Sequence, residues 1–141
     1  MKRTILCCLL VMMLFICSGL AYAEDLDEPI GDPDVPEYAE ASIVSARLII
    51  KSGEAICKTD VSVANSSSAN KMTVTVKYIK NSVGTVATKN ATAYRSGISF
   101  TAKTKYALPS SGTYHCKVTI KLYNGSTLLE TITVLTNSVT Y

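Results

Sequence analysis

The sequence has few of the side chains that carry out enzyme chemistry. It contains one histidine, His115, and after residue 40 only three acidic residues, Glu54, Asp60 and Glu130. It lacks a Gly-rich phosphate-binding loop, the HExxH and GxSxG motifs, and any paired spacing of metal ligands. We therefore expect a protein that is not an enzyme, with no catalytic residue, metal or cofactor. His115 is expected to be a solvated surface residue on a strand rather than a general base.

The first residues have the three parts of an export signal. Lys2 and Arg3 supply positive charge, residues 5–17 are apolar, and the Ala-Tyr-Ala sequence at 21–23 offers a cleavage site. The apolar run is too short to be a good membrane-spanning helix, although a retained anchor is the alternative. We expect residues 1–23 to be a signal peptide and the protein to be secreted or extracellular.

Loss of the signal peptide would leave two of the five cysteines, Cys57 and Cys116. Thiols are oxidised in an exported chain, and two cysteines allow one intramolecular pairing. The sequence therefore predicts a Cys57–Cys116 disulfide, with two free buried thiols as the alternative. By the chain-entropy estimate, closing this loop would stabilise the fold by about 4 kcal/mol.

Charge is divided sharply along the rest of the chain. Residues 24–40 contain eight acids, no base and three prolines, whereas residues 41–141 contain 12 Lys and Arg against 3 acids, a net charge of +9. The acidic segment has too little apolar surface to fold, so we expect a disordered tether. The tether is either a solvated spacer or a weak cover over the basic surface of the domain that follows.

Residues 41–141 lack helical periodicity of useful length, which excludes a helical or α/β fold. Short alternating runs predict six to eight β-strands, with turns at 52–53 and 124–125. Which side of the last strand, 128–134, faces the core is ambiguous. Side chains alternate along a strand, and this alternation puts its apolar residues on the same side as the charged Glu130. Without crossover helices the strands must form an antiparallel sandwich or barrel. Both cysteines lie on inward rows far apart in sequence, and a bridge between such rows favours the sandwich.

The run from Gly112 to Cys116 resembles the start of strand F in an immunoglobulin-type domain. Tyr114 stands two residues before the second cysteine, the position of the tyrosine corner in that family. The resemblance covers roughly residues 43–135 and implies an Ig-like β-sandwich of about seven strands with one inter-sheet disulfide. The resemblance also implies that Tyr114 is buried and that the Tyr114 hydroxyl is hydrogen-bonded to the backbone between residues 106 and 110.

The chain departs from this family at two points. It has no tryptophan for the core of strand C, so Val76 or Tyr78 must fill that space, and Ser110 stands where an acid is usual. Only the fold is therefore implied, and this fold serves many functions. The signal peptide and the Thr-, Ser- and Lys-rich domain together resemble small secreted proteins of Gram-positive bacteria.

Positive charge is the feature that most suggests a binding role. We expect four lysines on the outer face of the C- and F-like strands, beside His115: Lys71, Lys77, Lys117 and Lys121. Such a face would attract teichoic acids, sulfated glycans or anionic lipid, whereas nucleic acid is disfavoured because no aromatic stacking face is evident. The alternative is a solubilising coat, because the other sheet also has cations: Arg47, Lys51, Lys58, Lys103 and Lys105.

These observations predict a non-catalytic extracellular interaction domain with an anionic surface polymer as its partner. The alternative is a secreted inhibitor or antagonist that binds one protein partner through loops such as 65–70 or 124–126.

Overall fold

The computed structural model describes residues 38–141, in which every regular element is a β-strand. The predicted signal peptide and residues 24–37 of the predicted tether lie outside the described residues. The strands are β1 (Ala41–Lys51), β2 (Glu54–Val63), β3 (Lys71–Lys80), β4 (Gly84–Tyr94), β5 (Ser99–Ala107), β6 (Thr113–Asn124), β7 (Thr127–Leu135) and β8 (Val139–Thr140). The predicted all-β class is therefore confirmed.

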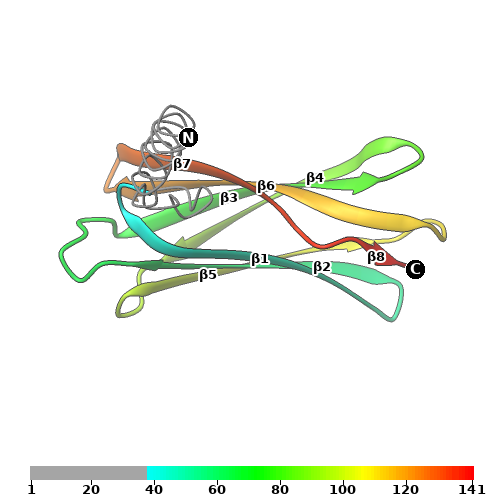
Figure 1. Ribbon diagram of the computed structural model, residues 1–141, viewed down its shortest axis with the longest axis horizontal. Coiled ribbons are helices and arrows are strands. Elements are labelled where there is room, and N and C mark those ends of the chain that lie inside the picture. Colours follow the sequence, from blue (N-terminus) through cyan, green and yellow to red (C-terminus); the bar gives the residue numbers. More distant parts are fainter. Residues whose placement is uncertain (1–37) are drawn as a thin grey trace, which may run out of the picture. The chain divides into compact units, whose positions relative to one another are not determined.

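The strands form two antiparallel sheets that lie one above the other (Figure 1). One sheet has the order β1-β2-β5. The other has the order β4-β3-β6-β7, and the short β8 pairs with the beginning of β6. The two layers enclose a single apolar core, which is the arrangement of a β-sandwich.

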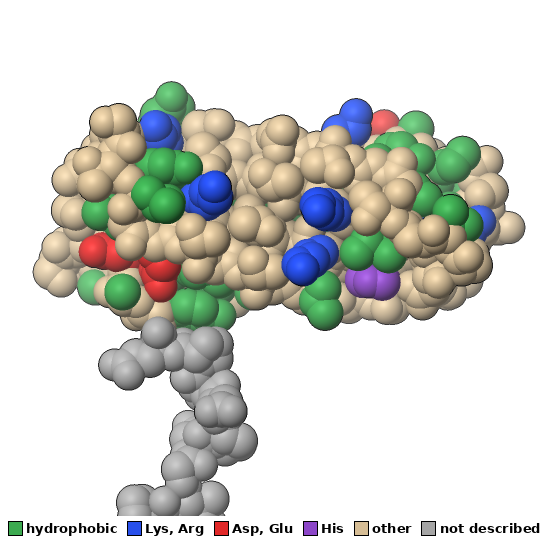
Figure 2. Space-filling model, turned by 90° about the horizontal axis from the view of Figure 1, so that it is seen from above, with side chains coloured by type: hydrophobic (Ala, Val, Ile, Leu, Met, Phe, Trp, Pro, Cys, Tyr) green, Lys and Arg blue, Asp and Glu red, His purple; other side chains and the backbone are tan. Residues whose placement is uncertain are grey.

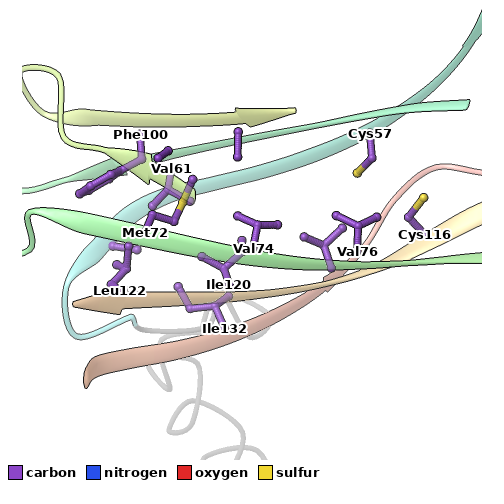
Figure 3. Close-up of a cluster of buried hydrophobic side chains, with 14 of the residues drawn as sticks. Cys57, Val61, Met72, Val74, Val76, Phe100, Cys116, Ile120, Leu122 and Ile132 are labelled. Atoms are coloured by element: carbon purple, nitrogen blue, oxygen red, sulfur yellow. The ribbon is translucent and has the colours of Figure 1, made fainter. Parts of the chain in front are cut away.

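The core is built from the inward rows that alternation predicts. β6 contributes Tyr114, Cys116, Val118, Ile120 and Leu122, all fully buried. Met72, Val74 and Val76 of β3 pair with three of these residues, and side chains such as Val61 and Phe100 approach from the other sheet (Figure 3). Burial of each large apolar side chain stabilises the fold by about 1.5–3 kcal/mol.

One predicted inward residue is exposed. The alternation of Ile98, Phe100 and Ala102 in the sequence predicts that Ile98 shares the inward row of Phe100, but 47% of its surface is accessible. The reason is that β5 begins only at Ser99, and Ile98 belongs to the tight turn closed by Ser96 and Ser99. Its carbonyl instead accepts the N–H of Val63 at 2.8 Å.

A β-bulge settles the facing of β7. Leu128 pairs with Tyr123 and Glu130 pairs with Leu122, so one extra residue, Leu129, lies on the β7 side. An extra residue reverses the facing of the positions before it relative to those after it. Leu128 consequently faces outward with Tyr123, whereas Ile132 is buried.

The two hairpin turns differ in their residues. Ser52 and Gly53 both have positive φ, 51° and 78°, as a type I′ turn requires. In the second hairpin Asn124 pairs with Thr127, so the two turn residues are Gly125 and Ser126, one position later than predicted. Gly125 has a φ of 58° and Ser126 does not have a positive φ, which matches a type II′ turn.

Candidate functional site

The four predicted lysines lie on one surface, the outer face of β3 and β6. Lys77 and Lys117 are paired directly across the two strands. Lys71 pairs with Tyr123, and its Nζ lies 4.8 Å from the centre of that ring. Lys121 is the diagonal neighbour of Lys71. The structure therefore brings the lysines together as two pairs near opposite ends of the face.

Uncharged polar side chains occupy the surface between and beside these pairs. They come from all four long strands of the sheet and alternate with buried residues: Thr73, Thr75, Thr88, Asn90, Thr92, Thr119, Thr131 and Thr133. Within the described part of the chain none of their side chains makes a hydrogen bond to another protein group. Their hydroxyl and amide groups are therefore available to a ligand.

The acidic residues of the folded region lie elsewhere. Asp60 is 2.8 Å from Lys58, and Glu54 is 3.3 Å from Lys105, both pairs on the three-stranded sheet. Partial burial raises the pKa of Asp60, but hydrogen bonds from Lys58 and Thr101 lower it by more, so the carboxyl stays charged well below neutral pH. Among residues 38–141 no ion pair involves a lysine of β3 or β6.

The third acid of the folded region, Glu130, has backbone partners. Its carboxylate accepts the N–H groups of Ala39, Glu40 and Ala41 at 2.9, 3.0 and 3.0 Å. Because Glu130 pairs with buried Leu122, its side chain belongs to the inner side of β7. The outer face of β4, β3, β6 and β7, as far as the structure describes it, has no acidic residue.

The opposite face of the sandwich also has cations. Arg47, Lys58 and Lys103 form one row across β1, β2 and β5. Two of the five cations on this face, Lys58 and Lys105, have a carboxylate partner. The charge therefore coats both faces, but acids neutralise part of it only on the three-stranded sheet.

His115 lies on the same outer face as the lysines, opposite Ile79. Its Nδ1 donates a hydrogen bond to Oδ1 of Asn81 at 2.8 Å. Both residues line a shallow hollow of about 540 Å³, together with Leu135, Thr136 and Ser138. Figure 2, which looks onto this face, shows the histidine close to Lys or Arg side chains and to hydrophobic ones. Sequence reasoning singled out His115 but not the hollow, whose remaining residues come from two other segments, 79–81 and 135–138.

Cys57 and Cys116 point toward each other from the two sheets (Figure 3). They are buried and lie 4.3 Å apart, and the structure holds them as two thiols. The predicted disulfide is therefore not formed in the structure, since the two sulfur atoms would have to approach to about 2 Å. The neighbouring Cys57 sulfur and burial both raise the pKa of the Cys116 thiol.

Tyr114 makes the hydrogen bond that its position predicts. Its ring is fully buried, and its hydroxyl donates to the carbonyl of Ser110 at 2.7 Å. This bond joins the beginning of β6 to the connection from β5, and it fixes how β6 enters the core.

Residues 38–141 contain neither a cluster of metal ligands nor a helix that could span a membrane. No three side chains of His, Cys, Asp or Glu lie close enough together to hold a metal ion. No helix in this part of the chain is long and apolar enough to cross a membrane.

Comparison with known proteins gives little. No protein-family model matches the chain, and no curated protein matches it. Among solved structures the chain is similar to a β-glucuronidase from Parabacteroides merdae, with 20% sequence identity and a TM-score of 0.39. The similarity covers 74% of this chain and 13% of that chain.

Proposed function

We propose that the protein is an exported, non-catalytic binding module with an immunoglobulin-like fold, and that the outer face of β4, β3, β6 and β7 binds an anionic polymer of a cell surface. The export signal read at residues 1–23 supports the extracellular location. The shortage of catalytic side chains supports a binding role.

The strand order supports the immunoglobulin-like assignment. β1, β2 and β5 take the places of strands A, B and E, while β3, β6 and β7 take those of C, F and G. β4 joins the second sheet beside β3 rather than the first sheet. Tyr78 of β3 fills the core position next to the cysteines, where a tryptophan is usual, and its hydroxyl bonds Thr104 at 2.8 Å. The Tyr114–Ser110 bond corresponds to the tyrosine corner.

We propose that Cys57 and Cys116 become a disulfide after export. Their side chains already face each other across the core, and an oxidising compartment favours the bridge. Formation of the bond requires the two sulfur atoms to approach to about 2 Å.

The observation that most supports polymer binding is the pairing of Lys77 with Lys117. Like charges placed directly across two strands destabilise a sheet, and no acid on this face compensates the pair. An anionic ligand would remove that repulsion. The free threonine hydroxyls around the lysines would add hydrogen bonds to such a ligand.

Matched charge variants test this proposal. Lys77→Gln/Lys117→Gln removes two charges from the proposed face, and Arg47→Gln/Lys103→Gln removes two from the other. With heparin as the probe at low salt, we expect the first variant to bind at least about tenfold more weakly, since a lysine near an anionic surface contributes on the order of 1 kcal/mol. The second variant should change binding much less. Equal losses would indicate a coat of charge and not a binding face.

One observation favours the alternative role as an inhibitor of a protein partner. Loop 65–70 and turn 124–126 are joined through Asn70, which bonds Asn124 and the N–H of Gly125 at 3.1 and 3.0 Å. Arg95 also donates to carbonyls of the loop, including that of Ala69 at 3.3 Å. Such a pre-organised loop pair reduces the entropy cost of docking to a protein. Recovery of one stoichiometric protein partner, with affinity unaffected by the lysine substitutions, would favour this role.

A further inference from the structure

The hollow beside His115 lies at one end of the proposed binding face. Its volume of about 540 Å³ is within the usual range for small-molecule sites. Ile79 follows Lys77 by two residues on β3, and His115 precedes Lys117 by two residues on β6. Side chains two residues apart on a strand point to the same side, so the hollow directly adjoins the lysine pair.

The polar groups of the hollow have defined roles. Because Asn81 Oδ1 accepts a hydrogen bond from His115 Nδ1, Nε2 is the ring nitrogen left for a ligand, and the Asn81 amide keeps its N–H groups as donors. The Ser138 side chain makes no hydrogen bond within the described residues. Thr136 is already engaged, since its hydroxyl bonds the Cys116 N–H and the Asn137 carbonyl, both at 2.9 Å.

The hollow also has an apolar side. Leu135, the last residue of the edge strand β7, is 66% exposed, and Ile79, which also lines the hollow, is half-buried. A ligand that fits must therefore combine three properties. It needs a negative group for the lysines, hydroxyl groups for His115, Asn81 and Ser138, and a compact apolar face for Leu135.

A charged pyranose ring has all three properties. We propose that the hollow binds the terminal sugar unit of an anionic glycan, a sugar that carries a carboxylate or a sulfate group. This inference rests on the proposed function, and it adds that the domain recognises the end of the polymer in addition to its charge. Lys77 and Lys117 would bind the anionic group, and the ring would pack on Leu135.

The test follows the methyl groups of Ile79 and Leu135 and the ring of His115 by NMR during titration. The probes are glucuronic acid, glucose 6-sulfate, glucose and inorganic sulfate, at constant ionic strength. We expect saturable shifts at these three residues with one or both charged sugars, and the pair distinguishes carboxylate from sulfate. Glucose and inorganic sulfate should give at least fivefold weaker binding. Equal binding of either one would overturn the proposal.

A matched pair of leucine variants completes the test. Leu135→Ser should weaken binding of the charged sugar at least fivefold, whereas Leu128→Ser, an exposed leucine at the other end of β7, should not. Both variants should still bind long heparin nearly as well as the unaltered protein. If heparin binding depends on Lys77 and Lys117 but charged sugars leave the hollow unshifted, the inference fails and the proposed function stands. If heparin does not bind at all, the proposed function itself fails.

Discussion

The side-chain amide of Asn137 pairs with the backbone of Leu48 as a neighbouring strand would. Its Oδ1 accepts the Leu48 N–H at 3.1 Å, and its Nδ2 donates to the Leu48 carbonyl at 3.2 Å. Leu48 lies on β1, at the edge of the three-stranded sheet, and Asn137 lies between β7 and β8 of the other sheet. One side chain thus joins the two sheets and satisfies two groups of an open strand edge.

We expect Asn137→Ala to lower the free energy of unfolding by about 1–3 kcal/mol, because two partly buried backbone groups lose their partner. Urea unfolding of the purified protein measures the change. Asn90→Ala, on the exposed outer row of β4, is the control and should shift stability by less than about 0.5 kcal/mol. Equal effects of the two substitutions would contradict the structural role of Asn137.

Tyr114→Phe should lower the free energy of unfolding by about 1 kcal/mol while leaving the fold intact. The substitution removes only the hydroxyl that donates to Ser110, and it leaves the Ser110 carbonyl without that partner. Tyr94→Phe is the matched control, because Tyr94 is 73% exposed. If both variants melt at the same temperature, the Tyr114 hydroxyl does not contribute to stability.

The exported protein should contain a Cys57–Cys116 disulfide. Intact mass after alkylation without reductant should show no modified cysteine, and reduction should then allow two. We expect the oxidised form to be more stable than the reduced form by about 4 kcal/mol, the entropy estimate for a loop of this length. Two alkylated thiols in the unreduced exported protein would show that the pair stays reduced.

The alternation of β2, β3 and β6 was strong enough in the sequence to predict nearly the whole core. Each of these strands is buried on one side and solvated on the other, so the period of two appears directly. The facing of β7 could not be predicted, because its bulge depends on pairing with Tyr123 and Leu122. Ile98 was misassigned because its side chain is apolar, although its position in a tight turn exposes it.

The candidate site was predictable to a similar extent. Sequence alternation assigns four lysines to one outer face, because each alternates with inward-facing apolar residues on a clearly patterned strand: Lys71, Lys77, Lys117 and Lys121. The hollow could not be predicted, since it requires segments 79–81 and 135–138 beside His115, which only tertiary structure brings together. The roles of Asn137 and Glu130 were missed for the same reason, because both bond residues about 90 positions away.

Stability should fall at high pH through Tyr78. Burial raises the pKa of Tyr78 to about 12, although its hydrogen bond with Thr104 lowers it in part. The unfolded chain ionises this tyrosine near pH 10, so the unfolded state binds fewer protons above that pH, and the native state loses stability as pH rises from 10 toward 12. The loss should be on the order of 2 kcal/mol, the free energy that a pKa difference of this size between the folded and unfolded states represents. Tyr78→Phe should remove this part of the pH dependence, measured as the difference between the free energies of unfolding of the two proteins from pH 9 to pH 12.

Glu130 should hold in place the backbone that leads into β1. Its carboxylate holds three consecutive backbone N–H groups, from Ala39 to Ala41, at the start of β1. Hydrogen bonds to a charged group contribute about 1.5–3 kcal/mol, and a glutamine side chain offers one neutral oxygen in place of two charged ones. We therefore expect Glu130→Gln to increase amide hydrogen exchange at residues 39–41 by at least tenfold, with little change in the core of β6. Glu54→Gln removes a carboxylate from the other sheet and is the control. If Glu130→Gln leaves exchange at residues 39–41 unchanged, then β1 pairing with β2, and not the carboxylate, orders this segment.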